Sequence, residues 1–214
     1  MVYTECMQND YEFLNSQEEH HLNDSFTISR YIQMARFGKS DISNILDFGI
    51  GSGQGGAILR SEFPEAHIIG IDAVKTRADK FNNAYDKVVY SSTQILPFKD
   101  NSFDLIVAGE VLEHILVSEV DFFLHEIFRV LKHDGVFVLT TPNPNDLKLR
   151  IRRGSVLGGS HVSQHFPKVT KLRLNLSGLR VICLRGTGKT SKVLGTRFPL
   201  SIYGSYLIAA KKAR

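Results

Sequence analysis

The sequence predicts an α/β protein built on a doubly wound parallel sheet. From residue 44 to residue 141, short apolar runs alternate with stretches of helical spacing, and a cluster of glycines separates the first apolar run from the helical stretch after it. Strands that alternate with helices imply a parallel sheet whose right-handed crossovers cover both faces. A chain of 214 residues is within the range of one such domain.

The expected strands are short runs of branched and aromatic apolar residues. Five of them belong to the alternating region and cover Asn44–Phe48, His67–Ile71, Lys87–Tyr90, Phe103–Ala108 and Val136–Thr140. The pattern changes after Pro142, and two further strands are expected over Leu179–Leu184 and Ser205–Ala210.

Between the strands, apolar residues recur at helical spacing. The expected helices are one from Phe26 that Gly38 ends, then Ala57–Phe63, Lys75–Asn83, 120–131, and one from Pro167 that stops at Gly178. Residues 1–38 are therefore interpreted as an N-terminal arm and helix, and residues 39–214 as the main domain. Prolines and glycines after residue 141 predict a lid or acceptor-binding segment near 142–166.

The composition is that of an ordinary globular protein, with 43% hydrophobic and 22% charged residues. It excludes a disordered chain, a collagen and a coiled coil, and no apolar stretch reaches the roughly 18 residues of a membrane span. The acidic, polar start MVYTECMQNDYEF is unlike a signal peptide. Cys6 and Cys183 are too few for a disulfide framework, so a reducing, cytoplasmic location is expected.

Charge is distributed unevenly along the chain. Residues 1–146 contain all 22 carboxylates, whereas residues 147–214 contain 15 lysines and arginines and no Asp or Glu. Such a split suggests an anionic partner for the C-terminal part. A solvated surface whose field is partly cancelled by the acidic part explains the same distribution, so both interpretations stay open.

The run DFGIGSGQGG, from Asp47 to Gly56, is the most informative stretch. Glycines between a strand and a helix let the backbone turn sharply and bring a ligand against bare N–H groups at the helix N-terminus. Gly51, Gly53 and Gly56 fit the G-x-G-x-x-G pattern of dinucleotide-binding folds. The same run, read as D-x-G-x-G-x-G with Gly49 as its first glycine, equally fits class I S-adenosylmethionine (SAM) methyltransferases.

Three further runs separate these two interpretations. They are LPFKDNSFDLIV (96–107), EVLEH (110–114) and FRVLKHDG (128–135). With the glycine loop they resemble the SAM-dependent methyltransferases of the type 11 group over roughly residues 40–141, a set of motifs that dinucleotide dehydrogenases lack. The resemblance implies a Rossmann-like methyltransferase fold, with a mostly parallel seven-stranded sheet and an antiparallel last strand, and SAM as cofactor.

The same resemblance implies which residues would hold SAM. Asp72, at the end of the second strand, would accept hydrogen bonds from the ribose, and Asp47 would orient the glycine loop. Where the family usually has an acid for the adenine amino group, the chain has Ser91-Ser92-Thr93-Gln94, so Ser92 or Gln94 would accept that bond and the backbone N–H of Thr93 would reach a ring nitrogen. The methionine part would meet the backbone of Gly49, Gly51, Gly53, Ala108 and Gly109.

The stretch Glu110-Val-Leu-Glu113-His114 resembles the one that holds a divalent metal in ubiquinone-pathway O-methyltransferases and small-RNA 2′-O-methyltransferases. The RNA enzymes add a later histidine, to which His161 corresponds when the chain is counted back without gaps from Gly178. Oxygen and imidazole ligands suit Mg²⁺, Mn²⁺ or Zn²⁺ without selecting one. Two alternatives stay open: His161 acts as a metal-free general base beside Glu113 and His114, or the Glu-His pair only packs beside the cofactor.

The preferred function is methyl transfer from SAM to a hydroxyl of a small or glycan-type acceptor. The basic run Lys148–Arg153 would bind a phosphate or carboxylate of an anionic acceptor, and a solvated basic loop is the alternative interpretation of the same run. Methylation of RNA at a ribose 2′-OH is the alternative, which the basic C-terminal part favours and the lack of tryptophan and of interleaved aromatic residues does not. A SAM-binding module without catalysis and an NAD-binding oxidoreductase are the further alternatives.

Overall fold

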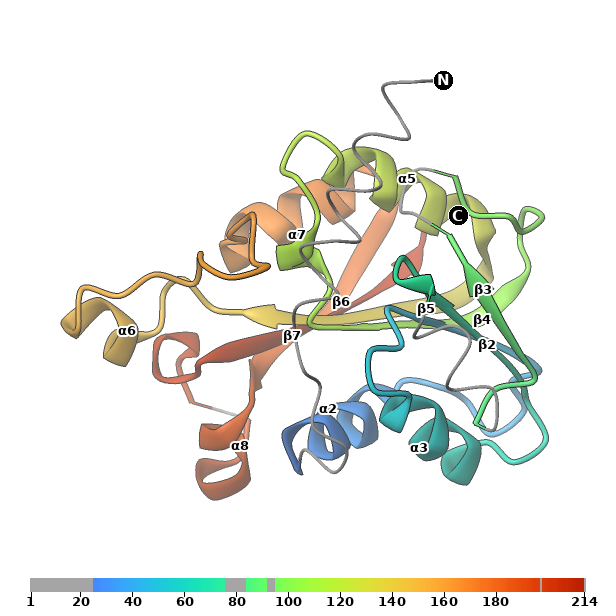
Figure 1. The fold of residues 1–214 in the computed structure, drawn as a ribbon, viewed down its shortest axis with the longest axis horizontal. Coiled ribbons are helices and arrows are strands. Elements are labelled where there is room, and N and C mark those ends of the chain that lie inside the picture. The colour runs from blue at the N-terminus through green and yellow to red at the C-terminus, as the bar shows by residue number, and fades with distance from the viewer. Residues whose placement is uncertain (1–24, 76–83, 92–94, 197, 214) are drawn as a thin grey trace.

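The computed structural model describes residues 25–75, 84–91, 95–196 and 198–213. In this part of the chain, seven strands form one sheet in the order β3-β2-β1-β4-β5-β7-β6 (Figure 1). The first five strands pair in parallel, and β7 is antiparallel to both of its neighbours. The strands are β1 (Asn44–Phe48), β2 (His67–Asp72), β3 (Lys87–Tyr90), β4 (Phe103–Gly109), β5 (Leu131–Pro142), β6 (Leu179–Thr187) and β7 (Ser205–Lys212). The predicted doubly wound, mostly parallel seven-stranded sheet with an antiparallel last strand is therefore confirmed.

Helices cover both faces of this sheet, and the buried apolar side chains form one cluster on each face (Figure 1). One face carries α2 (Ser25–Ala35), α3 (Gln54–Glu62) and α8 (Lys189–Leu194). The other face carries α5 (Val120–Val130) and α7 (Pro167–Leu176). Shorter elements in the connections are α6 (Leu147–Ile151) and the 3-10 turns η1 (Leu112–His114) and η2 (Leu200–Ile202).

Helix α5 shows how the sequence pattern produces this packing. Its buried side chains recur at helical spacing as one apolar stripe against the sheet. Within that stripe, the Phe123 ring meets the Phe48 ring of β1 edge to face, with ring centroids 5.0 Å apart.

Several element boundaries differ from the predicted ones. Strand β5 begins at Leu131, directly after α5, and continues to Pro142, because its antiparallel pairing with β7 extends to the Pro142–Ser205 register position. Helix α3 begins three residues earlier than predicted, at Gln54. Short helices α6 and α8 lie in segments for which the sequence predicted no helix. The predicted helix Lys75–Asn83 lies outside the described residues from position 76 onward.

The carboxyl ends of β1, β2 and β4 lie side by side. Phe48, the last residue of β1, is in register with Ile71 of β2 and Ala108 of β4. The glycine loop after β1, Asp72 at the end of β2 and Gly109 at the end of β4 therefore meet at one edge of the sheet. Ligands of open α/β sheets bind at this edge. No helix in the described part of the chain is long and apolar enough to cross a bilayer.

Candidate functional site

The loop between β1 and α3 turns through three glycines in the left-handed region. The φ angles of Gly49, Gly51 and Gly53 are 78°, 51° and 73°, where other side chains are strained. A Cβ at Gly49 would also lie 2.6 Å from Cγ2 of Val111. The N–H of Gly49 donates a 2.8 Å hydrogen bond to the carbonyl of Ile71, which fixes the loop to β2. The loop thus presents backbone without side chains at the N-terminus of α3.

Asp72 ends β2 beside this loop, and its side chain is buried. Its Oδ2 accepts a 3.1 Å hydrogen bond from the N–H of Gly51, and its Oδ1 accepts a 2.8 Å hydrogen bond from the N–H of Val74. The first of these two bonds joins the end of β2 to the glycine loop. Asp72 therefore orients the loop.

Asp47, at the end of β1, is fully buried between two tyrosines. The hydroxyl of Tyr31 donates to its Oδ1 and the hydroxyl of Tyr85 donates to its Oδ2, each at 2.7 Å. Burial raises the pKa of Asp47 to about 7, although both hydroxyl groups favour its charged form. Asp47 also holds the loop indirectly, because Tyr85 in turn accepts a 3.0 Å hydrogen bond from the N–H of Gly56.

The two glycines that begin α3 make room for these tyrosines. A Cβ at Gly55 would collide with the ring of Tyr31, and a Cβ at Gly56 would collide with the ring of Tyr85. Gly56 is also the last glycine of the dinucleotide pattern. In this chain its small size serves a packing role, since it lets a tyrosine reach the buried carboxylate.

Glu110 follows β4 with a φ of 57°, an uncommon conformation for a residue other than glycine. Its Oε2 lies 3.3 Å from Nη1 of Arg30 in α2 and accepts a 3.4 Å hydrogen bond from the hydroxyl of Ser205. Its Oε1 is buried and has no hydrogen-bond partner among the described residues. Glu110 therefore links α2 to the edge of the sheet while one of its oxygens stays unsatisfied.

Glu113, in η1, is a second buried carboxyl group. The hydroxyl of Thr141 donates a 2.9 Å hydrogen bond to its Oε2, whereas Oε1 has no partner in the described part of the chain. Burial, followed by the nearby negative charge of Glu110, raises the pKa of Glu113 well above its usual value. A buried carboxyl group with an unsatisfied oxygen is the kind of group that a cation or a substrate proton would stabilise.

Glu113, His114 and His161 each place one ligand-type atom within 4.8 Å of the others. The two imidazole rings pack edge to face with centroids 4.9 Å apart. Nδ1 of His114 lies 3.2 Å from the carbonyl of Ser160, and Nδ1 of His161 lies 2.9 Å from the carbonyl of Val156. In His161, the carbonyl at Nδ1 selects the tautomer that carries its proton on Nδ1, so the lone pair of this ring lies on Nε2.

The segment that carries His161 is fixed to η1 through backbone and side-chain bonds. The N–H groups of Val162 and Ser163 both donate to the carbonyl of Glu113, at 3.0 and 3.1 Å. His165 is buried next to them, with Nε2 2.9 Å from the carbonyl of Leu112. Burial lowers the pKa of His165 to about 4, so this imidazole is neutral at physiological pH. His165 thus anchors the segment that places His161 beside His114.

The structure brings most of the predicted site residues to this one edge. Ala108 and Gly109 end β4 next to the glycine loop, as their predicted backbone role requires. Glu110, predicted as a fourth metal ligand, is not part of the Glu113–His114–His161 group and pairs with Arg30 instead. Ser92, Thr93 and Gln94 lie outside the described residues. The residues that sequence reasoning missed as members of the site are Arg30, Tyr31, Tyr85 and Thr141.

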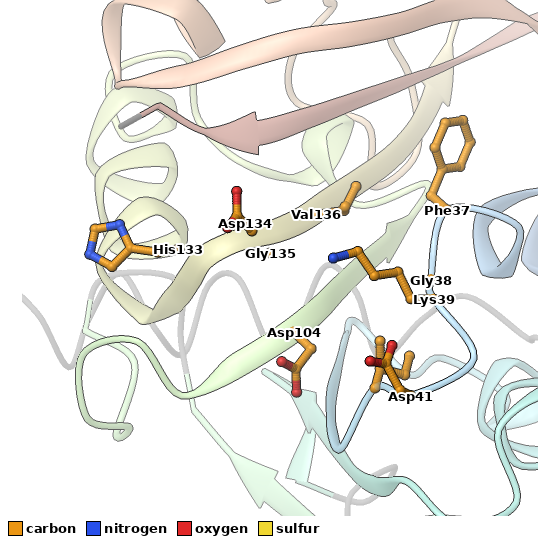
Figure 2. Close-up of a pocket in the computed structure, with 10 residues that line it drawn as sticks. Phe37, Gly38, Lys39, Asp41, Asp104, His133, Asp134, Gly135 and Val136 are labelled. Carbon is orange, nitrogen blue, oxygen red and sulfur yellow. The ribbon is translucent and has the colours of Figure 1, made fainter.

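A separate pocket opens at the other edge of the sheet, near the amino ends of β4 and β5 (Figure 2). Figure 2 shows Asp104, Lys39 and His133 among its lining side chains. Asp104 pairs with Lys132 at 2.9 Å and accepts a 2.9 Å hydrogen bond from the N–H of Asn44. This pocket therefore lies away from the glycine loop, and its carboxylate serves to fasten β1 to its neighbours.

Part of the chain is similar to known proteins. Residues 46–139 match the family model described as a methyltransferase domain. The chain is 30% identical over 158 residues to the mitochondrial ubiquinone biosynthesis O-methyltransferase of Bos taurus, covering 64% of this chain and 41% of that protein. It is 29% identical over 137 residues to the malonyl-[acyl-carrier protein] O-methyltransferase of Laribacter hongkongensis, covering 57% and 45%. It is 28% identical over 120 residues to the ubiquinone/menaquinone biosynthesis C-methyltransferase of Desulfotalea psychrophila, covering 53% and 48%.

These relatives include enzymes that methylate oxygen and enzymes that methylate carbon. The chain spans less than half the length of each of them. The matches therefore favour SAM over a dinucleotide as the ligand of the glycine loop, and they leave the methylated atom open.

Solved structures share the whole fold. A chain of the Haloferax volcanii complex between the Trm112 methyltransferase activator and a methyltransferase superposes with a TM-score of 0.73 at 15% identity, covering 96% of this chain and 98% of that chain. A SAM-dependent methyltransferase from Archaeoglobus fulgidus gives 0.65 at 20% identity, covering 94% of both. The Burkholderia thailandensis 1,6-didemethyltoxoflavin-N1-methyltransferase, solved with S-adenosylhomocysteine bound, gives 0.69 at 14% identity, covering 100% and 90%. At sequence identities this low, the structural similarity shows the fold alone.

Proposed function

We propose that this chain, whose residues 46–139 match the model of a methyltransferase domain, transfers the methyl group of SAM to a hydroxyl of a small or glycan-type anionic acceptor. The observation that carries this proposal is the group of Glu113, His114 and His161 at the carboxyl edge of the sheet. An alcohol is a weak nucleophile that needs a base or a metal to remove its proton, whereas many nitrogen acceptors need neither. A carboxyl group and two imidazoles beside the cofactor site would provide such a base or bind such a metal.

The glycine loop and Asp72 fit SAM. The three left-handed glycines leave a backbone surface that side chains would fill, and the buried Asp72 carboxylate stands at the end of β2, where ribose hydroxyls would meet it. SAM supplies a methyl group on a sulfonium, whose leaving group departs neutral and needs no general acid. The chain's own task is therefore to hold and align the two reactants and to exclude water.

His161 is the residue assigned to deprotonate the acceptor hydroxyl. Its Nδ1 is occupied by the carbonyl of Val156, so Nε2 is the basic atom, and the packed ring of His114 fixes its orientation. Glu113 lies next to both imidazoles with an unsatisfied buried oxygen, which would stabilise the proton that Nε2 takes up.

The same three residues fit a divalent metal. They offer one carboxylate oxygen and two imidazole nitrogens within 4.8 Å of one another, and the carbonyls at both Nδ1 atoms are the outer partners that metal-binding histidines usually have. Glu113, His114 and His161 would hold Mg²⁺, Mn²⁺ or Zn²⁺, which would acidify a bound hydroxyl. Glu110 contributes negative charge nearby and remains paired with Arg30.

The proposed negative charge of the acceptor rests on the segment that leads from β5 to His161. Lys148, Arg150, Arg152 and Arg153 are all exposed there, and none has an ion-pair partner among the described residues. Arginine side chains bind phosphate and carboxylate through paired hydrogen bonds. The acceptor would therefore carry one of these groups.

The test is methyl transfer from SAM labelled with ¹³C in the methyl group to a panel of catechols, sugar phosphates, amines and activated carbon acids. The carbon chemical shift of the product separates O-, N- and C-methylation. The proposal expects O-methyl products, and more product from phosphorylated or carboxylated acceptors than from neutral analogues. The variant His161→Asn should retain S-adenosylhomocysteine binding and lose transfer. Products methylated only on nitrogen or carbon would refute the O-methyl assignment.

A second candidate function is 2′-O-methylation of RNA, which the 15 cationic and no acidic residues of 147–214 favour. Methylation of a ribose in a short RNA, together with an affinity that falls steeply as salt rises, would favour it over a small acceptor. Binding of RNA without ribose methylation would count against it.

A further inference from the structure

A second cavity is lined by residues of α2 and α8. Both helices cover the same face of the sheet (Figure 1). The cavity has a volume of about 510 Å³, within the range of small-molecule sites. None of its lining residues belongs to the glycine loop or to the Glu113–His114–His161 group. One side of the cavity is formed by α2 and the residue after it, through Ser25, Ile28, Ser29, Ile32, Gln33 and Arg36. The other side is formed by β6, α8 and the residues after α8, through Arg185, Ser191, Lys192, Gly195 and Thr196.

The charge of this cavity is positive. Arg36, Arg185 and Lys192 line it, and none of the lining residues that the structure describes is a carboxylate. None of these three cations has an ion-pair partner within the described ranges 25–75, 84–91, 95–196 and 198–213. Three cations that share a concave surface without a carboxylate repel one another, and a bound anion would remove that repulsion.

Two buried polar atoms beside the cavity also lack partners. Oε1 of Gln33 and Nε of Arg185 are both buried without a hydrogen bond to any described residue. The bonds that the Gln33 amide nitrogen makes, to Ser29 at 3.4 Å and Ser191 at 3.5 Å, are at the long limit for hydrogen bonds. Buried polar groups are normally satisfied. A ligand with both a hydrogen-bond donor and a hydrogen-bond acceptor would satisfy these two atoms.

The cations are held in place by contacts that leave their charge uncompensated. Arg185 donates from Nη2 to the carbonyl of Gln33 at 3.3 Å and stacks over the ring of Phe37. Nζ of Lys192 donates to the carbonyl of Ser25 at 2.8 Å and lies over the ring of Phe26. Carbonyl groups and aromatic rings orient a cation without neutralising it, so both charges remain available to an anion.

From this geometry we propose that the α2–α8 cavity binds a small molecule that carries a phosphate or carboxylate group and also hydroxyl groups. The three cations would hold the anionic group. The hydroxyls of Ser25, Ser29, Ser191 and Thr196, with the amide of Gln33, would bond the polar remainder, and the two isoleucines would pack against its carbon skeleton. This site is distinct from the proposed methyl-transfer site and does not depend on it.

The cavity also shares a helix with the cofactor edge. Ser29 and Gln33 face the cavity, whereas Arg30 and Tyr31 of the same helix reach Glu110 and Asp47. Positions 29 and 33 are one turn apart on one side of the helix, and 30 and 31 point to the other side. Both sides of α2 thus face a site.

The experiment is a calorimetric titration of the full chain, saturated with S-adenosylhomocysteine, with inorganic pyrophosphate in one arm and citrate in the other. Saturable binding of one molecule of either probe per chain is expected, and the arm that binds identifies phosphate or carboxylate as the preferred group. The double variant Arg36→Gln/Lys192→Gln should weaken binding at least about tenfold, because it removes two of the three cations. In the same sample, backbone amide NMR shifts should move at Ser29, Gln33 and Thr196.

The matched control is Lys171→Gln/Arg180→Gln, which removes the same charge from exposed positions that do not line the cavity. It should change the affinity less than about twofold, because distant exposed charges are screened by salt. Absence of saturable binding in the unmodified chain overturns the proposal. An equal loss of probe affinity in both double variants also overturns the proposal, because the whole basic surface, and not the cavity, would then account for the binding. Binding of a single-stranded RNA with no binding of either probe also overturns it.

Discussion

The hydroxyl of Tyr31, in helix α2, donates a 2.7 Å hydrogen bond to Oδ1 of Asp47 at the end of β1. Tyr85 donates to the other oxygen at the same distance. Burial raises the pKa of both phenols well above their usual value, so they remain donors at every physiological pH. Asp47 has these two fixed donors and no ion-pair partner among the residues that the structure describes, so its surroundings depend on the packing of α2 and of the residues before β3.

Ionisation of Asp47 is expected to oppose folding. Its pKa is raised from 3.8 to about 7 in the folded chain, so the folded state binds the proton more tightly than the unfolded state. The stability that this group contributes is complete below about pH 4 and is lost as the pH rises to about 7. Asp47→Asn removes this dependence. The free energy of unfolding of the variant, relative to the unmodified chain, should rise between these pH values by up to about 4 kcal/mol.

Urea unfolding at a series of pH values measures this difference. Other carboxyl groups, including Glu126 and Asp104, have lowered pKa values and act in the opposite direction, so only the difference between the two chains isolates Asp47. Parallel curves for variant and unmodified chain would contradict the raised pKa.

Gly55→Ala is expected to destabilise the fold by about 2 to 3 kcal/mol, as overpacking of a buried site does. The added Cβ would collide with the ring of Tyr31 and displace the hydroxyl that bonds to Asp47. Gly204→Ala is the matched control, because a Cβ there meets nothing within 4 Å. Urea midpoints of the two variants give the comparison, and equal midpoints would show that Tyr31 yields without cost.

The fold was largely predictable from the sequence because its central strands, such as β1 and β4, are buried on both faces. Runs such as FDLIVAG in β4 are too apolar to be anything but core, and parallel topology follows from their alternation with helices. The length of β5 was not predictable, because it depends on pairing with β7, a strand more than 60 residues later in the chain. The start of α3 at Gln54 was hidden by Gly55 and Gly56, which are poor helix formers retained for the tyrosines that pack on them.

The site was predictable only where a local motif carries it. Gly49, Gly51 and Asp72 form such a motif, and the geometry places them against one another. Tyr31 was visible only as one apolar member of a helical stripe, because a sequence does not reveal that its hydroxyl meets a carboxylate 16 residues away. The position of Asp47 inside an apolar strand does indicate that hydrogen-bond donors must lie near it in the fold, but it does not identify them.

Asp72→Ala is expected to weaken S-adenosylhomocysteine binding by at least about 30-fold, which corresponds to about 2 kcal/mol for a lost charge-assisted interaction. The substitution also removes the acceptor of the Gly51 N–H, so part of the loss would come from the loop. A titration with the 2′-deoxy derivative separates the two contributions. The unmodified chain should discriminate between the two ligands, and the variant should not; discrimination that survives in Asp72→Ala would place the ribose contact elsewhere.

Glu113→Gln is expected to leave S-adenosylhomocysteine affinity within about twofold and to lower turnover about 100-fold or more, as removal of a group that acts on the proton or the metal does. Glutamine retains the acceptor for the Thr141 hydroxyl, so the fold should be preserved. Treatment of the unmodified chain with a chelator distinguishes the two roles. Loss of activity that Mg²⁺, Mn²⁺ or Zn²⁺ restores would assign a metal, and activity that survives chelation would assign His161 as a metal-free base.

His165 is expected to make the fold less stable in acid. Burial lowers its pKa from 6.5 to about 4. Between these two pH values the imidazole is therefore protonated in the unfolded chain and neutral in the folded chain. Its contribution to stability is therefore complete above about pH 6.5 and is lost as the pH falls to about 4, by up to about 3 kcal/mol. His165→Gln should flatten this part of the stability curve, because an amide can still donate to the carbonyl of Leu112 and does not titrate.

The loss of stability in acid should appear first in the segment that His165 anchors. Hydrogen exchange at pH 5 should show faster exchange of the Val162 and Ser163 amides, which bond to the carbonyl of Glu113, than of the amides of β4. In His165→Gln the exchange of these two amides, corrected for intrinsic rates, should change little between pH 5 and pH 7. Equal acid sensitivity in both chains would show that another group releases the segment, and His161 would then be positioned independently of its neighbour.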